Sequence, residues 1–375
     1  MSLIQRVLTN LEERRQRILN GEINCIPSPF KTFLNDFPGI EQGKYYCVSG
    51  ASKSGKSQLS NYLFLYTPIL YAYEHPEQLR VQIFYFPLEE TPEKITMRFM
   101  CHLLYILSHN KIRVSPMKLQ SVNNGCPVEK EVLDLLNSLE YRSILDFYED
   151  HVHFISERNP TAAWKTISKY AQEAGTIHKK MAVIENKDTG VKQEKEVFDF
   201  YEPKDKDEYV IIIWDHQSLT AVETDKNTGR TLTLKESIDK LSEYFMIFRN
   251  HYDYIPVMIA QQNSETISLD AFKANKIRPT LAGIADSKNV GKDCSVMIGI
   301  TNPFAFEVPD YLKYNIVRLR GYARFLEMVL NREGESNGVL PLYFDGATNF
   351  FAPLPAYNDE TKLQKYYNLI QEYSK

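Results

Sequence analysis

The clearest chemical signal in the sequence is residues 50–57, which read Gly-Ala-Ser-Lys-Ser-Gly-Lys-Ser. This spacing is typical of a loop whose backbone N–H groups surround nucleotide phosphates, backed by the positive end of the following helix. Gly50 and Gly55 leave room for the phosphates, and Lys56 supplies a positive charge for the β and γ phosphates. Because the Ser57 hydroxyl suits Mg²⁺, we expect ATP and Mg²⁺ to bind here. The expected contacts are Gly50, Ala51, Ser52, Lys53, Ser54, Gly55, Lys56, Ser57 and Gln58.

Two carboxylate positions follow apolar runs that are typical of buried strands. Asp215 ends the run 210–214, and Glu89 and Glu90 come shortly after the run 81–86. Ligands of open α/β sheets bind at the carboxyl ends of the strands, so both positions belong near the phosphates. Asp215 is expected to hold Mg²⁺ opposite Ser57. Either Glu89 or Glu90 has the chemistry of a general base that deprotonates the attacking water.

An amide follows a third apolar run, 255–260, at the equivalent position. Gln261 is our candidate for a sensor of the γ phosphate, with Gln262 and Asn263 as alternatives. Each of these strand-end residues also has a plain structural interpretation as a polar turn. The histidines do not combine into a metal site, because no third ligand is spaced to join His151 and His153.

Basic residues cluster in the two loops that follow Asp215 and Gln261. Such loops can track the phosphates of a single nucleic-acid strand, although charge in loops more often serves only solvation. The candidate DNA-binding residues are Lys226, Arg230, Lys273, Lys276 and Arg278, with Lys235 in the same cluster as Arg230.

The elements that must position these residues alternate between strand and helix from residue 44 onward. The apolar runs predict strands at 44–50, 81–86, 152–156, 209–214, 255–260 and 295–301, and the intervening patterns predict helices at 56–70, 92–107, 161–174 and 234–251. Continuous apolar strands separated by helices indicate an α/β fold with a mostly parallel, twisted sheet covered on both faces. An antiparallel pair is predicted at 325–330 and 338–344, and a last helix at 360–373.

Three regions make up the predicted domain organisation. Residues 1–24 contain an amphipathic helix at 3–20, capped by Ser2 and ended by Gly21, which either folds back on its own domain or docks on a neighbouring subunit. Residues 25–356 form the ATPase domain, with polar inserts at 108–150, helical in its second half, and at 185–208, resembling a charged hairpin-like loop. Residues 357–375 contain the C-terminal helix.

Composition narrows the class of protein. The 375 residues carry a net charge of −4, so any nucleic-acid contact must come from local basic loops. No apolar run approaches the roughly 18–20 residues of a membrane helix, and the N-terminus does not read as a signal peptide. The five cysteines form no CxxC pair, which favours a reducing compartment, and we expect a cytoplasmic protein.

The order of these motifs resembles the helicase domain of the DnaB-like replicative helicases, which have a RecA-type P-loop ATPase core. The resemblance covers about residues 25–350 and rests on Ile26-Pro27-Ser28, the turn at 39–43, the phosphate loop, the motifs that end at Glu90, Asp215 and Asn263, and the segment 285–300. It implies that Glu89 is the catalytic base, Asp215 a magnesium ligand and Gln261 the γ-phosphate sensor.

The same resemblance implies a basic finger that reaches the ATP of the next subunit. The family carries this finger in a Lys-x-Arg arrangement, which falls on 330–332 here, so Arg332 fits and Leu330 replaces the lysine. Arg320 and Arg324 are the reserve candidates.

The implied protein is a hexameric, ATP-driven helicase that moves on single-stranded DNA, with a primase and a helicase loader as partners and a bacteriophage as source. The rival interpretations are a recombinase of the RecA or RadA type, a clock-type ATPase, and an ATP-binding loader or assembly factor with weak turnover.

Overall fold

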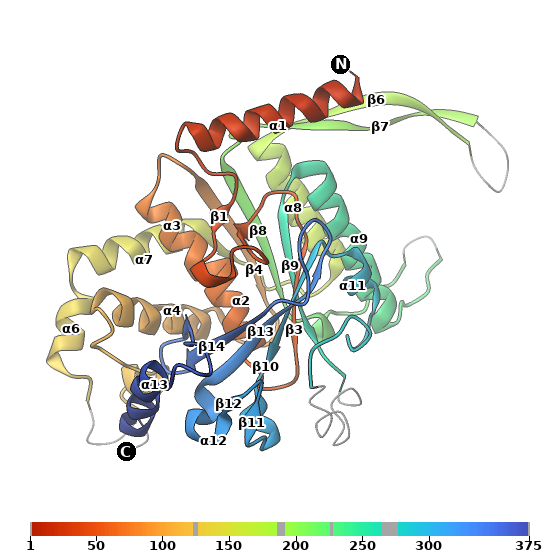
Figure 1. Cartoon of the computed structure of the whole chain (residues 1–375). Helices are drawn as coiled ribbons and strands as arrows, with labels where there is room; N and C mark the ends of the chain where they lie inside the picture. The colour runs from red at the N-terminus through yellow and green to blue at the C-terminus, as the bar shows by residue number, and fades with distance from the viewer. Residues whose placement is uncertain (1, 123–126, 186–191, 226–227, 264–276, 374–375) are drawn as a thin grey trace.

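The computed structural model describes residues 2–122, 127–185, 192–225, 228–263 and 277–373, and Figure 1 shows the arrangement of their helices and strands. Within these residues the centre of the fold is a nine-stranded sheet. Its strands, in spatial order, are β15 (Phe350–Pro353), β14 (Val339–Asp345), β13 (Ala323–Asn331), β10 (Val296–Thr301), β3 (Tyr46–Gly50), β9 (Ile255–Gln261), β8 (Glu208–Asp215), β4 (Arg80–Pro87) and β5 (Val152–Phe154). The strands from β10 to β5 are parallel, and β13, β14 and β15 extend the sheet in antiparallel order. The predicted fold class and the predicted antiparallel pair are both confirmed.

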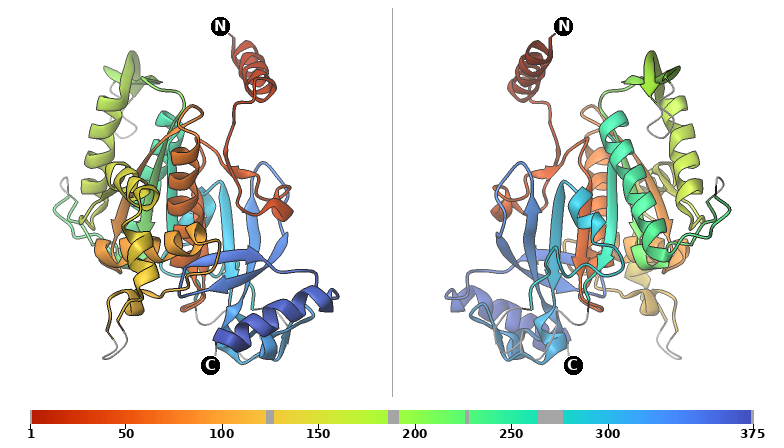
Figure 2. Two further views of the ribbon diagram at one scale, coloured as in Figure 1. Left: turned by 90° about the vertical axis from the view of Figure 1, so that its left-hand side faces the viewer. Right: turned by 90° about the vertical axis from the view of Figure 1, so that its right-hand side faces the viewer.

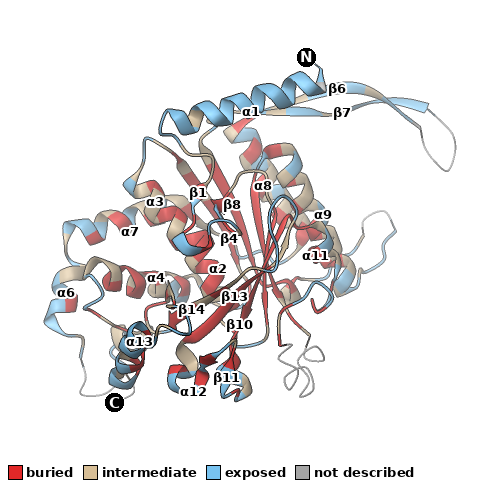
Figure 3. Ribbon diagram, in the orientation of Figure 1, coloured by how far each residue is buried: buried red, intermediate tan, exposed pale blue. Residues whose placement is uncertain are grey.

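Successive side chains along the parallel strands pack alternately into two separate apolar clusters. On β8, for example, Ile211 and Ile213 enter one apolar cluster, whereas Ile212 and Trp214 enter the other. The first cluster packs against α2 (Lys56–Asn61), α3 (Thr67–Glu74), α4 (Pro92–Leu107), α6 (Lys130–Leu136) and α7 (Leu139–His151). The second packs against α8 (Pro160–Ala174), α9 (Leu234–Tyr252) and α11 (Asn289–Asp293). Burial on both faces is why these strands read as continuous apolar runs rather than alternating ones. Figure 3 shows the strands as the most buried part of the molecule.

The short elements complete the fold around this sheet. The helix after the phosphate loop continues from α2 through one π-helical segment, Tyr62–Tyr66, into α3. The remaining short elements are β1 (Ile26–Pro27), β2 (Gly39–Ile40), α5 (Pro116–Leu119), β11 (Asp310–Tyr311), β12 (Tyr314–Asn315) and α12 (Ile316–Leu319). The C-terminal helix α13 (Glu360–Tyr373) has the predicted bounds and packs with α12 over a third apolar cluster. The predicted helices in the second half of 108–150 are present as α6 and α7.

The expected insert at 185–208 is a longer structure than the sequence indicated. Its two strands, β6 (Gly175–Glu185) and β7 (Lys192–Pro203), form an antiparallel arm that begins directly after α8. The arm extends away from the body of the molecule (Figure 1). The prediction missed most of β6 because residues 177–184 combine the polar run 178–180 with a short apolar run, 181–184, and show neither strict alternation nor a long apolar stretch. In the structure these residues are exposed or only partly buried.

The N-terminal helix α1 (Leu3–Leu19) forms as predicted. Ser2 and Gln5 make a capping box, and Gly21 follows the helix with a φ of +79°, a conformation that favours glycine. Figure 2 shows α1 standing clear of the body and apart from the β6–β7 arm. Its apolar side chains, Ile4, Val7, Leu8, Leu11 and Ile18, are all exposed.

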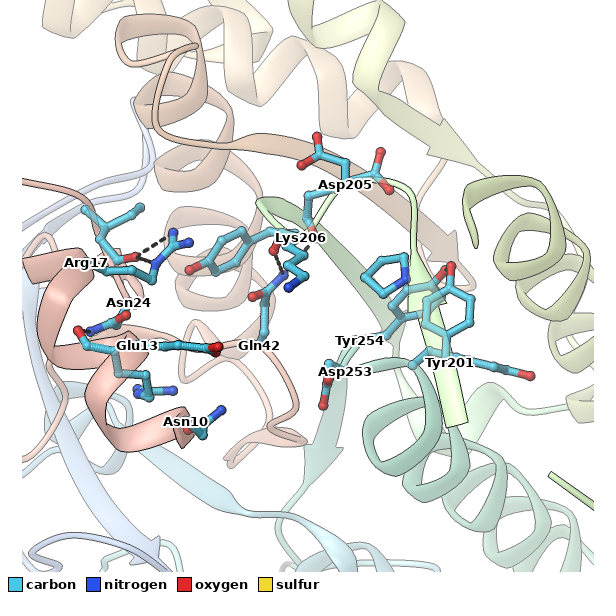
Figure 4. Close-up of a pocket in the computed structure, with 16 residues that line it drawn as sticks. Asn10, Glu13, Arg17, Asn24, Gln42, Tyr201, Asp205, Lys206, Asp253 and Tyr254 are labelled. Carbon is cyan, nitrogen blue, oxygen red and sulfur yellow. Dashed lines mark hydrogen bonds between the residues drawn. The ribbon is translucent and has the colours of Figure 1, made fainter. Parts of the chain in front are cut away.

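Among the described residues, the polar contacts between α1 and the rest of the chain come from the C-terminal half of the helix. Arg17 donates to Asp207 at 2.6 Å and to the Ile23 carbonyl, and Arg14 pairs with Glu41 at 3.1 Å. A polar cleft of about 320 Å³ separates this half of the helix from the body (Figure 4). The helix is therefore held at one end while its apolar side stays uncovered.

Candidate nucleotide-binding site

The phosphate loop lies between β3 and α2, at the carboxyl edge of the sheet. Gly55 has a φ of +98°, which favours glycine, and a Cβ on Gly50 would lie 2.7 Å from the carbonyl oxygen of Ile300. Both glycines are therefore required by the local geometry. Lys56 begins α2 and is buried (9% exposed), so its side chain is largely removed from solvent. A loop without side chains at these points, opening a helix, fits the phosphates of a nucleotide.

Arg324, on β13, holds the phosphate loop through a hydrogen bond to its backbone. Its Nε donates to the carbonyl oxygen of Ser54 at 2.7 Å, and its Nη1 donates to the carbonyls of Gly321 and Ala323, both at 2.8 Å. The side chain is only 6% exposed and lies over the ring of Phe344, and burial lowers the pKa of the guanidinium to about 9, so it stays charged at neutral pH. Arg324 was a reserve candidate for the finger. Its burial under its own phosphate loop removes it from that role.

Asp215 and Ser57 meet as the sequence predicts for a magnesium site. The Ser57 hydroxyl donates to Asp215 Oδ1 at 3.0 Å, and the hydroxyl of Tyr85 lies 3.1 Å from Oδ2. Asp215 is 3% exposed, and this burial raises the pKa of its carboxyl to about 6, against the lowering effect of its two hydrogen bonds. One hydroxyl and one carboxylate fit Mg²⁺, which keeps several waters and shares its remaining ligands with the phosphates.

Sequence reasoning missed two residues of this group. The Tyr85 hydroxyl is placed between Asp215 and Asn61, whose Oδ1 lies 2.9 Å away, so it has two acceptors for one proton. Asn61 follows Ser57 by four residues on the same helix, and therefore faces the same side. That spacing was the available signal.

Glu89 and Glu90 have different surroundings. Glu90 pairs with Arg98 at 2.5 Å, whereas the side chain of Glu89 is 53% exposed and lies 3.7 Å from Nε2 of His216. Burial lowers the pKa of His216, and its Nδ1 has no hydrogen-bond partner among the described residues. Glu89 is the carboxylate with access to water, which favours it over Glu90 as the base.

Gln261 and Gln262 also differ in burial and in hydrogen bonding. Gln262 is buried, and its amide nitrogen donates to the Ser49 hydroxyl at 2.8 Å and to the Thr280 carbonyl at 3.1 Å. Gln261 is half-buried, lies opposite Gly50 in the parallel pair of β9 and β3, and its side chain makes no hydrogen bond to a described residue. The amide that is free to sense a phosphate is therefore that of Gln261, and Gln262 connects the two strands below it.

The candidate DNA-binding residues are only partly covered by the structure. Lys226, Lys273 and Lys276 lie outside the described residues. Arg230 is exposed and pairs with Glu236 at 2.6 Å at the start of α9. Arg278 points its Nε toward Glu327, 3.6 Å away.

Arg332 lies far from the phosphate loop of its own chain. Asn331, the last residue of β13, pairs with Val296 at the start of β10, whereas the opposite end of β10 pairs with Gly50. The Arg332 Nε donates to the Cys294 carbonyl at 2.9 Å, and Nη2 contacts the Lys292 carbonyl. Arg332 therefore lies at the opposite end of the strands from the phosphate loop of its own chain. Arg320, the other reserve, is exposed on the turn before β13.

The described residues lack two further features. They contain no group of three or more His, Cys, Asp or Glu side chains placed to hold a metal ion together. None of the helices in this part of the chain has the length and apolar character needed to cross a membrane.

The fold has known relatives among solved structures. One is the structure of an ATPase domain, which matches with a TM-score of 0.64 and 11% identity, over 94% of this chain and 99% of that chain. Another is the structure of a DnaB-like replicative helicase, solved with its interactions with primase, which matches with a TM-score of 0.61 and 12% identity, over 94% of this chain and 67% of that chain. No family model matches the sequence, and neither does any curated protein. The chain therefore shares the RecA-like fold of DnaB-type ATPase domains.

Proposed function

We propose that this protein is an ATP-driven DNA helicase of the DnaB type, which hydrolyses ATP to move along single-stranded DNA. The observation that carries the proposal is the convergence of Lys56, Ser57, Asp215 and Glu89 at one edge of the parallel sheet. The shared fold over 94% of the chain supports the choice of a helicase over other P-loop ATPases.

Each of these residues has a distinct task in hydrolysis. Lys56 and the loop amides bind and orient the triphosphate, while Ser57 and Asp215 hold the magnesium ion, which supplies charge stabilisation at the terminal phosphates. Glu89 accepts the proton of the attacking water. His216, 3.7 Å from Glu89, limits the positions that this carboxylate can adopt.

The same proposal includes a ring in which each ATP lies between two subunits. Two observations support it. The apolar side of α1 is uncovered, and a neighbouring subunit would cover it. Arg332 lies at the edge of the sheet opposite its own phosphate loop, which suits action in trans. A primase is the partner that the second structural match suggests.

The test compares two adjacent carboxylates. Glu89→Gln should retain ATP binding, lose at least about a hundredfold in ATP hydrolysis and stop the unwinding of a forked duplex. Glu90→Gln, the matched control, should hydrolyse ATP at nearly the normal rate because Glu90 is already engaged with Arg98. Wild-type protein that hydrolyses ATP without stimulation by DNA would favour the loader instead. Filaments rather than rings in electron micrographs with an ATP analogue and an oligonucleotide would favour a recombinase.

A further inference from the structure

Glu327 is a buried carboxylic acid in the middle of β13, inside the stretch 325–330, whose other residues are apolar. It is 5% exposed. Its Oε1 lies 3.4 Å from the hydroxyls of Thr301 and Tyr311, and its Oε2 lies 3.6 Å from Nε of Arg278. All three separations exceed the usual hydrogen-bond length, so the carboxylate is only partly compensated. Burial raises the pKa of Glu327 to about 7, although Arg278 and the two hydroxyls pull it down.

The groups that face Glu327 are few. In the sheet its neighbours are Gly299 on β10 and Val339 on β14, neither of which can carry charge. Tyr311 contributes a hydroxyl from β11, and burial beside Glu327 raises the pKa of that phenol. Among the described residues, Arg278 is therefore the cation on which the charge of Glu327 depends.

Arg278 lies at the boundary between the interior and the solvent. Its side chain is 39% exposed, in contrast to the buried carboxylate that holds it. It also lines a small cavity together with Ala51 of the phosphate loop and Gln262. The preceding residue, Ile277, is held mainly by its buried side chain in the third apolar cluster, and its carbonyl lies 3.4 Å from the Thr301 hydroxyl. The Arg278 backbone is thus anchored while its guanidinium has access to a ligand in solvent.

We propose that Glu327 is a positioning residue, which pairs with Arg278 until single-stranded DNA binds. The guanidinium of Arg278 then pairs with a DNA phosphate instead, and Glu327 takes up one proton from solvent. This inference rests on the proposed function, because it requires that the protein bind a DNA strand. An arginine exchanges readily between a carboxylate and a phosphate, since its planar fork pairs with either anion. A buried carboxylate that loses its cation is neutralised instead of remaining charged.

The direction of the resulting pH dependence follows from linkage. In the free protein the pKa of Glu327 is about 7, and withdrawal of Arg278 removes an interaction that lowers it. The DNA-bound protein therefore has the higher pKa and binds more protons, so affinity for DNA falls as pH rises above about 7. With one linked proton the loss approaches about tenfold per pH unit, and below pH 7 the curve flattens.

The experiment measures binding of the full-length protein to a labelled oligothymidine by fluorescence anisotropy between pH 6 and pH 9 at constant ionic strength. Wild type should weaken above pH 7 as stated. Glu327→Gln should be flat in this range and should bind up to about thirtyfold more tightly than wild type at pH 8.5, because Arg278 is no longer held. Glu335→Gln, the same change at an exposed site beyond the end of β13, should retain the wild-type profile. Calorimetry in two buffers of different ionisation enthalpy should show uptake of up to one proton per bound strand by wild type at pH 8 and less by Glu327→Gln.

A second variant tests the inference even if Glu327→Gln fails to fold. Arg278→Gln changes a partly exposed side chain, and should bind the oligonucleotide more weakly than wild type at pH 6 and show no slope above pH 7. Equal slopes in wild type and Glu327→Gln, or wild-type affinity in Arg278→Gln, would overturn the inference and leave the helicase proposal intact. Failure of wild type to bind DNA at any pH would instead defeat the proposed function, and the inference with it.

Discussion

Replacing Asp215 with asparagine should abolish ATP hydrolysis and, in the absence of metal, make the protein more stable. The carboxyl is buried between Ser57 and Tyr85, and an uncharged amide can hydrogen-bond to the same two hydroxyls. What the substitution removes is a negative charge held out of water without a cation in direct contact among the described residues. A residue needed for metal binding is expected to carry such a cost in the empty site.

The size of this effect follows from the pKa of Asp215. Burial raises it from 3.8 to about 6, and this difference of about 2 pKa units is worth ~3 kcal/mol. Because the folded chain holds the proton more tightly than the unfolded chain, folding stability falls as pH rises from 3.8 to 6. Above pH 6 the whole penalty is present. Asparagine does not titrate, so Asp215→Asn should exceed wild type by up to ~3 kcal/mol at pH 8 and by about half of that at pH 5.

Urea unfolding in EDTA at pH 5 and pH 8, without nucleotide, measures this difference. Asp345→Asn is the matched control, because Asp345 is also fully buried but binds Arg113 through two bonds of 2.6 and 2.7 Å. Breaking that pair leaves a guanidinium without its anion, so this variant should lose stability, by about 3 kcal/mol. If Asp215→Asn were instead less stable than wild type at pH 8, the carboxylate would be compensated in a way that the structure does not show, and the reasoning would fail.

Three further predictions concern the neighbours of this site and α1. Arg324→Gln should weaken ATP binding by at least about tenfold in a fluorescent-nucleotide titration, and lysine should not restore it, because a single ammonium nitrogen cannot occupy the positions of both Nε and Nη1; unchanged affinity would refute this role of Arg324. Gln262→Ala should lower the free energy of unfolding by about 1–3 kcal/mol, whereas Gln261→Ala should leave it unchanged and reduce DNA-stimulated hydrolysis; equal losses of stability would contradict their separate roles. Leu8→Glu should dissociate the assembly in light scattering without lowering the unfolding temperature of the subunit, because Leu8 is exposed within it; an intact oligomer would place the interface elsewhere.

The strands of the sheet could be predicted from the sequence, but few of the side-chain contacts between the elements could. Apolar runs located strands such as β8 to within a residue at each end, because a strand buried on both faces has no polar interruption. The phosphate loop and Asp215 could be found because each depends on its immediate neighbours in the chain. The β6–β7 arm was predicted only as a hairpin-like insert at 185–208, and most of β6 was missed because its apolar run is shorter than those of the buried strands.

Contacts between segments that are distant in the chain could not be predicted from the sequence. Arg324 looked like one of several late arginines, and nothing near it in the chain reveals that its acceptor is the Ser54 carbonyl. The choice between Glu89 and Glu90 depended on a nearer contact, with Arg98 on α4, which the spacing alone did not reveal. Glu327 is visible in the sequence as a single acid inside the apolar stretch 325–330. An acid in a predicted buried strand indicates a buried polar group that needs a partner.

Strand β13 has a mechanical consequence. Near its first residue it touches the phosphate loop through Arg324, at its middle it holds Arg278 through Glu327, and just past its last residue comes Arg332. An extended chain spans about 26 Å over these eight steps and has little compliance along its axis. The pairing with β10 skips Val329, and a bulge of this kind bends a strand locally. In a ring, β13 would run from one ATP toward the next, so a displacement at one end would reach the other with this bulge as the place where the strand can bend.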